Sequence, residues 1–113
     1  MFNHWMRAEN RNQEGECYQV NAGVIAKYNE SAGRLDELRV DGQPVQDDRL
    51  YTLGLQGYHA KNSQAFLNVS MDELRQAGRS RVVATCVQDL ALEYLREHQN
   101  FREQVEGRLQ YLR

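Results

Sequence analysis

The chain of 113 residues has no long apolar run, one proline, two cysteines and no excess of positive charge. A membrane-spanning helix needs about 20 consecutive apolar residues, and no stretch of this sequence approaches that length. The formal net charge is −2, which gives no basis for electrostatic binding to nucleic acid or to an anionic membrane. Cys17 and Cys86 lie far apart without CxxC spacing, so we expect two free thiols that are largely buried.

Catalytic motifs are also lacking. His4, His59 and His98 are scattered, and none has a second metal-binding residue at a useful spacing. The sequence contains no P-loop, no GxGxxG and no GxSxG. Hydrolytic chemistry requires a metal cluster, a nucleophile with its base, or a pair of carboxylates. The residues therefore predict neither a catalytic site nor a metal site within this chain.

What the sequence does contain is the composition of a globular domain. Hydrophobic residues make up 41% of the chain and charged residues 27%, which is typical of a folded protein. A chain of this length forms at most one domain, and it buries about two-thirds of its unfolded surface. We therefore expect residues 1–113 to form a single domain.

Alternating apolar residues predict a sheet in the first half of the chain. In residues 18–28 every second residue is apolar or aromatic from Val20 onward, which predicts a strand with one buried face. A second strand is expected to end at Asp41-Gly42, a strong hairpin signal. Pro44 is expected at a sheet edge or in a loop, and residues 50–55, LYTLGL, are predicted to form a third strand.

Helices are predicted at the N-terminus and in the second half of the chain. Residues 2–6 have the apolar spacing of a short helix. Ser70 and Glu73 form a capping box for a helix that Gly78 closes. The apolar residues 81–85 are predicted to form a buried strand.

A longer helix is predicted from Thr85 to His98, with Thr85 and Gln88 as its capping box. We expect its apolar stripe to pack on the sheet; the stripe consists of Val87, Leu90, Ala91, Tyr94 and Leu95. Residues 105–112 alternate again and predict a final strand. These elements predict a mixed α/β (α+β) domain, in which helices cover a mixed sheet of about five strands.

The segment LQGYHAKNSQAF, residues 55–66, has neither a helical nor a strand period. It follows the predicted strand at residues 50–55, so we expect a loop at the edge of the sheet, where ligand clefts of α/β domains form. Tyr58 follows Gly57, and no apolar period requires its ring in the core. We therefore predict that Tyr58 is partly exposed at the mouth of a shallow pocket, with Gln56 and Gln64 nearby.

Three stretches of the sequence together resemble a known family. GECYQVNAGVIAKYN, RVDGQPVQDDRLYTLGLQGY and the closing VEGRL resemble the C-terminal domain of the 5′-nucleotidases. That group also includes UDP-sugar hydrolases and 2′,3′-cyclic-nucleotide phosphodiesterases. The resemblance covers nearly the whole chain in the right order, although no single motif is decisive.

The resemblance implies a fold like that of this C-terminal domain and a longer parent protein. In the family, an N-terminal metallophosphatase domain holds a pair of divalent metal ions and a catalytic Asp–His pair, while the C-terminal domain supplies the nucleotide pocket. This chain would then be a fragment that lacks the metallophosphatase domain and is inactive by itself. Family members are often periplasmic, secreted or on the cell surface, and this sequence shows no signal that fixes the compartment.

The resemblance also implies a nucleotide-binding loop. The family's loop reads roughly Asn-Asp-Phe-Leu-Ala-x-Gly-Gly-Asp-Gly-Tyr/Phe; its first aromatic stacks on the base and its Asp holds the ribose hydroxyls. Gln56 falls on the Asn, Tyr58 on the stacking Phe, Gln64 on the ribose Asp and Phe66 on the last aromatic. Replacing the Asp by Gln64 weakens ribose binding, because a charge-assisted hydrogen bond is about twice as strong as a neutral one.

Other positions depart further from the family. The Gly-Gly-Asp-Gly core is replaced by residues 62–65, Asn-Ser-Gln-Ala, so we expect the loop to follow a different path. A second stacking Phe of the family falls near Cys17, beside Tyr18, so the aromatic sandwich is complete only if Tyr18 fills it. Packing alone accounts for Phe66 and Cys17 more readily than ligand contact does, whereas for Tyr58 ligand contact is the favoured interpretation.

Two functions stay open from the sequence. The first is a nucleotide-recognition domain, with a nucleotide or related phosphoester and the parent's metallophosphatase domain as partners, and neither nucleic acid nor membrane. The second is a structural or interaction module of a metallophosphatase whose substrate is not a nucleotide. The retained aromatic at Tyr58 favours the first function, and the lost glycines of the loop favour the second.

Overall fold

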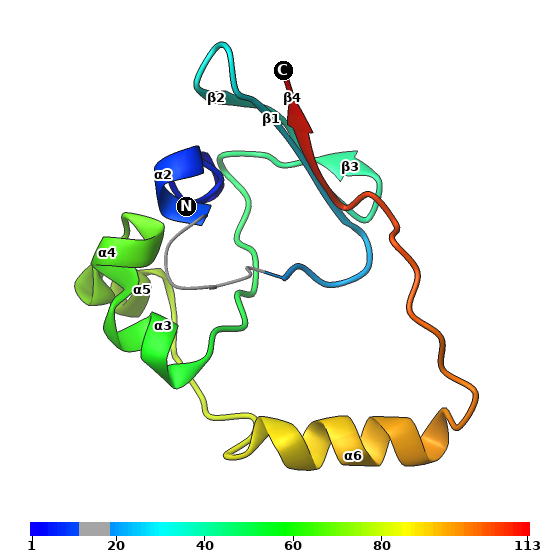
Figure 1. Cartoon of the computed structure of the whole chain (residues 1–113). Coiled ribbons are helices and arrows are strands. Elements are labelled where there is room, and N and C mark those ends of the chain that lie inside the picture. Colours follow the sequence, from blue (N-terminus) through cyan, green and yellow to red (C-terminus); the bar gives the residue numbers. More distant parts are fainter. Residues whose placement is uncertain (12–18) are drawn as a thin grey trace.

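The structure, a computed structural model, describes residues 1–11 and 19–113. Its central element is a four-stranded mixed sheet. The spatial order of the strands is β3-β2-β1-β4, and their bounds are Val24–Asn29 for β1, Arg34–Val40 for β2, Gln43–Pro44 for β3 and Leu109–Leu112 for β4. β1 pairs antiparallel with β2 and parallel with β4, so the last strand of the chain lies beside the first (Figure 1). The mixed α+β class is confirmed, with four strands in the described residues where the sequence predicted about five.

The hairpin between β2 and β3 forms where the sequence predicts it. Asp41 and Gly42 both have positive φ angles, 51° and 77°, as a tight two-residue hairpin turn requires. Pro44 lies in the edge strand β3, where its missing N–H costs no ladder hydrogen bond. Gly23 is also favoured here, because its φ angle of 87° lies in the left-handed region that side chains rarely adopt.

Two predicted strands are wrong. Residues 50–55 and 81–85 belong to no strand, and the side chains of Leu50, Val82 and Val83 are about four-fifths exposed. Both segments run outside the sheet: residues 50–55 lie between β3 and α3, and residues 81–85 lie between α5 and α6 (Figure 1). An apolar run indicates side chains that can be buried, but it does not determine which other strand pairs with it by backbone hydrogen bonds. Here no such neighbour is within pairing reach in the described part of the chain.

Six helices accompany the sheet in the described residues. Their bounds are Phe2–Trp5 for α1, Ala8–Arg11 for α2, Gly57–Lys61 for α3, Ser63–Leu67 for α4, Met71–Ala77 for α5 and Val87–Glu97 for α6. The capping box of α5 is confirmed, because the Glu73 N–H donates to Ser70 Oγ at 3.1 Å and the Ser70 N–H donates to Glu73 Oε2 at 2.7 Å. The capping box predicted for α6 is wrong: Cys86 occupies the N-cap and its side chain makes no capping hydrogen bond.

The core lies between one face of the sheet and helices α1 and α4. Its buried cluster consists of Trp5, Met6, Ala26, Tyr28 and Leu67. The alternation predicted for residues 18–28 is confirmed from Val24 to Tyr28, where every second residue is buried. It is wrong before Val24, because Ala22 is exposed in the turn that precedes β1. Helix α1 and its C-cap residue Met6 therefore contribute two of the five side chains of this cluster, although the helix is only about one turn long.

The other face of the sheet is polar. Lys27 Nζ lies 2.6 Å from Glu37 Oε2, and Arg39 also pairs with Glu37. Hydrogen bonds from Lys27 and then from Arg39 hold the pKa of Glu37 below its usual range. Nearer the β1–β2 turn, Asp36 accepts from Asn29 and from Arg34 in the same way. A face covered by such charged side chains favours water over an apolar helix.

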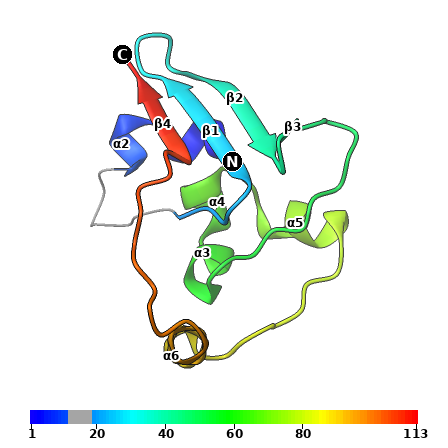
Figure 2. The ribbon, with the colours of Figure 1, turned by 90° about the vertical axis from the view of Figure 1, so that its right-hand side faces the viewer.

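Helix α6 lies apart from the sheet, at the end of two extended connections (Figures 1 and 2). The stripe predicted to pack on the sheet is instead about half exposed: the exposed fraction is 58% for Val87, 49% for Leu90 and 48% for Leu95. That packing prediction is therefore wrong. The reason is the sheet itself, since α1 and α4 cover one face and charged side chains cover the other.

Truncating a side chain of the core should lower the free energy of unfolding much more than truncating one of α6. Tyr28→Ala should lower the free energy of unfolding by about 3–5 kcal/mol, the range for a buried aromatic ring. Leu90→Ala, in dilute solution, should lower it by less than about 0.5 kcal/mol, as for exposed positions. Urea titrations followed by the fluorescence of Trp5, the only tryptophan, measure both values. A cost of several kcal/mol for Leu90→Ala would show that the stripe is covered in the folded monomer.

Candidate functional site

An aromatic cluster on α3 and α4 is the structural counterpart of the predicted binding loop. The centroids of Tyr58 and Phe66 are 5.5 Å apart, those of Tyr58 and His59 5.7 Å, and those of His59 and Phe66 5.6 Å. These separations and the tilted or edge-on angles are typical of attractive aromatic pairs. The predicted loop is thus two short helices that meet at Asn62, and their junction brings the three rings together.

The rings of this cluster differ in exposure. Tyr58 is 55% exposed, which confirms the prediction that this ring is partly exposed. Phe66 is half-buried and packs against the hydrophobic core, as the packing interpretation of this residue predicted. The His4 Nε2 atom lies 3.0 Å from the carbonyl oxygen of Ala65, which ties α4 to α1. The exposed ring therefore stands on a support that the core holds in place.

The two glutamines predicted beside Tyr58 lie on the same pair of helices. Gln56 is the N-cap residue of α3, and its carbonyl accepts from the Ala60 N–H at 2.9 Å. Gln64 is exposed, and its Nε2 donates to the Asn68 Oδ1 at 3.2 Å. Gln64 therefore retains its own carbonyl oxygen for another donor. Cys17 and Tyr18, also predicted for this site, lie outside the described residues.

Ser63 is the unusual residue of the helix junction. It replaces a glycine of the family pattern and is 1% exposed, yet its hydroxyl has no hydrogen-bond partner in the described part of the chain. An unsatisfied buried hydroxyl costs about 1–3 kcal/mol. The junction is therefore held by the apolar contacts of Phe66 and Leu67 with the core and by Asn62, whose Nδ2 donates to the Tyr58 carbonyl at 3.0 Å, and not by the Ser63 hydroxyl.

Neither of two surface hollows of the described residues lies at Tyr58, where the sequence predicted a pocket. One hollow lies along α6, and another lies between α2 and the β1–β2 hairpin. The described residues hold no group of three His, Cys, Asp or Glu side chains placed to bind a metal ion. No helix within the described ranges is long and apolar enough to cross a membrane. What the site offers chemically is an exposed aromatic surface with neutral amides beside it.

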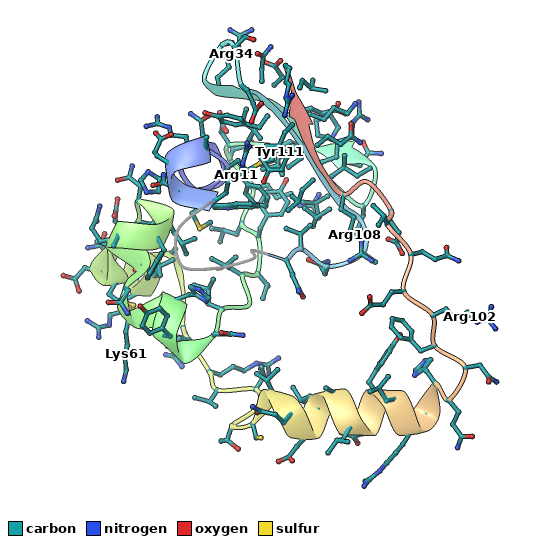
Figure 3. All side chains as sticks on the ribbon, in the orientation of Figure 1. Arg11, Arg34, Lys61, Arg102, Arg108 and Tyr111 are labelled. Atoms are coloured by element: carbon teal, nitrogen blue, oxygen red, sulfur yellow. The ribbon has the colours of Figure 1, made fainter. Side chains whose placement is uncertain are left out.

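A cation–π and ion-pair network near the chain ends is a second polar centre, which the sequence did not predict. The Arg11 guanidinium lies 4.0 Å from the centroid of the Tyr111 ring, and it also pairs with Glu30 (Figure 3). Arg113 Nε lies 3.6 Å from the second carboxylate oxygen of Glu30. The network joins α2 to β4 and the end of β1, three segments that no spacing in the sequence connects. Two guanidinium groups share the one carboxylate of Glu30, so the network ties α2 to the C-terminal end of the chain.

A second aromatic cluster lies at the C-terminal end of α6. The Tyr94 and His98 rings are stacked with centroids 4.1 Å apart, and Phe101 meets Tyr94 edge-on at 5.7 Å. Tyr94 and Phe101 are about half exposed. The helical spacing of Tyr94 and His98 is the sequence signal that could have predicted this stack, since residues four apart are neighbours on a helix.

Comparison with protein-family models, with curated proteins and with solved structures finds no match for this chain. The resemblance to the 5′-nucleotidase C-terminal domain therefore stays a prediction from the sequence.

Titration of Tyr111 should be visible in the pH dependence of stability. Burial raises the pKa of the Tyr111 phenol. As the pH rises past about 10, the ordinary tyrosine pKa, the unfolded chain releases this proton before the folded chain does. The stabilising contribution of the neutral phenol is thus present below that pH and is lost above it.

Tyr111→Phe should therefore show a smaller loss of stability between about pH 9 and pH 11 than the wild type. Urea titrations across this range give the comparison, with Tyr51→Phe as the control at a more exposed ring. An equal alkaline loss in Tyr111→Phe and in the wild type would contradict the assignment.

Proposed function

We propose that this chain is the nucleotide-recognition domain of a 5′-nucleotidase-type metallophosphohydrolase, which hydrolyses phosphate esters of nucleotides. The observation that carries the proposal is the ring of Tyr58, which is 55% exposed and braced by Phe66 at 5.5 Å. An exposed ring on a rigid support provides a stacking surface at little cost in conformational entropy. It occupies the position at which the resembling family stacks the base.

Stacking supplies the base contact in this proposal. A nucleic-acid base on an aromatic side chain is worth about 1–3 kcal/mol and tolerates any base, because every base has a π-face. Gln64 contributes a carbonyl acceptor, and Gln56 a side-chain amide with donors and an acceptor, for the sugar or the base edge. Without the family's carboxylate, these neutral groups bind ribose hydroxyls weakly. We therefore expect binding to the isolated chain to be weak.

A positive charge lies on the same helix as the stacking ring. Lys61 is three residues after Tyr58 on α3, and residues with this spacing are neighbours on a helix. Its side chain extends away from the body of the protein (Figure 3) and makes no ion pair within the described residues. A nucleotide whose base stacks on Tyr58 would thus have its phosphate near the positive charge of the Lys61 ammonium group.

The catalytic metals belong to the parent protein in this proposal. The described residues do not offer a ligand set for the pair of divalent ions that the family uses. No step of hydrolysis is therefore assigned to this chain, whose part is to bind and orient the nucleotide.

The alternative function is a structural or interaction module of a metallophosphatase with another substrate. One observation favours it: the apolar stripe of α6 is exposed and offers a surface for another protein segment. The two functions differ in what Tyr58 does, so variants of this ring distinguish them.

The isolated chain should release no phosphate from AMP with any divalent metal. The physical reason is the missing set of metal ligands and nucleophile. A phosphate-release assay of the purified chain, with heat-inactivated protein as the control, measures this. Metal-dependent release above the control would contradict the assignment of the catalytic residues to another domain.

Tyr58→Ala should weaken nucleotide recognition. In the full-length parent it should raise KM by about 5- to 150-fold, the equivalent of roughly 1–3 kcal/mol, with little change in kcat, because the ring touches the base and not the phosphorus. Tyr58→Phe should retain most of the affinity, and Tyr51→Ala serves as a matched tyrosine control outside the site. An unchanged KM in Tyr58→Ala would favour the structural or interaction module.

A further inference from the structure

Helix α1 contacts two separate parts of the structure with two adjacent side chains. The Leu35 N–H of β2 donates to the Asn3 Oδ1 atom at 2.8 Å. The His4 Nε2 atom lies 3.0 Å from the Ala65 carbonyl oxygen of α4. A carbonyl oxygen only accepts hydrogen bonds, so Nε2 carries the hydrogen and donates it. Consecutive side chains of a helix point about 100° apart, and α1 therefore joins the sheet to α4.

The bond from His4 is the polar attachment of α4 to the rest of the fold. The side-chain hydrogen bonds of Asn62 and Gln64 stay within α3, α4 and the residue that follows α4. Within the described residues, His4 makes the only hydrogen bond that joins α4 to α1 or to the sheet. The other attachment is apolar, through Phe66 and Leu67.

Helix α4 is a segment for which such an attachment matters. Ser63, at its start, is 1% exposed and its hydroxyl has no hydrogen-bond partner in the described part of the chain, so docking of α4 keeps a polar group from water without compensation. Asn68, at its end, has a φ angle of 54°, in the left-handed region that few residues other than glycine adopt. A short segment with such features opens locally at a lower free-energy cost than the core of the fold.

The position of α4 decides whether the ring of Tyr58 is braced. Phe66 is the aromatic residue of α4, and its ring centroid lies 5.5 Å from that of Tyr58. The peptide bond between Ala65 and Phe66 is planar, so the carbonyl that His4 binds and the backbone nitrogen of Phe66 move as one unit. The bond from His4 thus holds the backbone from which the bracing ring extends.

We propose that His4 is a positioning residue for nucleotide recognition. Its hydrogen bond keeps α4 docked against α1, and the docked Phe66 supports the ring of Tyr58 on which the base stacks. When α4 opens, this support is lost and the binding-competent fraction of the molecules falls. The apparent dissociation constant rises as that fraction falls. This inference rests on the proposed function of Tyr58 as the base-stacking ring.

Titration of the full 113-residue chain with AMP, followed by NMR, tests the role of His4. His4→Phe keeps a ring but removes the donor. It should raise the dissociation constant for AMP by about two- to tenfold, the range that corresponds to the net contribution of one hydrogen bond. It should also weaken the nuclear Overhauser contacts between the ring protons of Tyr58 and Phe66.

Two further variants separate positioning from a general effect on the fold. His4→Gln places an amide donor at the reach of the Nε2 atom, so it should restore both AMP binding and the ring contacts. His98→Phe is the matched control, because this histidine lies at the C-cap of α6 and should leave both measurements unchanged. The amides of β1 should keep their protection from hydrogen exchange in every variant, since the opening of α4 is local.

The outcomes distinguish this inference from the proposed function. Weaker AMP binding in Tyr58→Ala but not in His4→Phe would overturn the role of His4 and leave base stacking intact. Equal weakening in His4→Gln and His4→Phe would also overturn it, because the side chain would then act by packing alone. AMP binding that is absent from the wild type, or unchanged in Tyr58→Ala, would overturn the proposed function and this inference together.

Discussion

The backbone ladder between β1 and β4 joins the beginning of the domain to its end, and the other elements depend on it. The Ala26 N–H donates to the Arg108 carbonyl at 2.8 Å, and the Glu30 N–H donates to the Leu112 carbonyl at the same distance. Parallel pairing cannot be made by a tight turn, so the whole segment from β2 to α6 forms the connection. Closing so long a loop costs conformational entropy, which the ladder, the packing of Tyr28 and the Arg11–Tyr111 contact must offset.

This constraint divides the molecule into two parts with different physical character. The sheet, α1 and α4 share the buried cluster around Met6 and Tyr28, and the aromatic cluster of Tyr58 stands on that support. The connection from residue 78 to residue 108 contributes no side chain to the buried cluster. Exposed apolar side chains are concentrated there, including those of Val82, Val83 and the α6 stripe. The exposed ring of Tyr58 and the exposed apolar stripe of α6 thus lie in different parts of one short chain.

The two candidate functions follow this division and are compatible with each other. A stacking ring on α3 suits a nucleotide, while an exposed helix with charged borders suits a protein surface. The ring of Tyr58 belongs to α3, which is a separate element from α6 (Figure 2).

Local features were predictable from the sequence because their causes are local. The alternation of β1, the Asp41-Gly42 turn, the capping box of α5 and the partly exposed ring of Tyr58 each follow from a few neighbouring residues. The helical pattern of α6 was also readable, since side chains with helical spacing form a stripe in any context.

Only the tertiary structure decided which strands pair, which helices cover the sheet and which residues far apart in the sequence are in contact. The apolar segments at residues 50–55 and 81–85 have strand composition but no partner strand, and α6 has an apolar stripe but no free apolar face of the sheet to cover. The Arg11–Tyr111 contact joins residues one hundred positions apart, which no periodicity can indicate. The residues of this sequence determine which surfaces can be buried. Which of them are buried depends on whether the folded chain brings a complementary surface within reach, and this is a property of the whole structure.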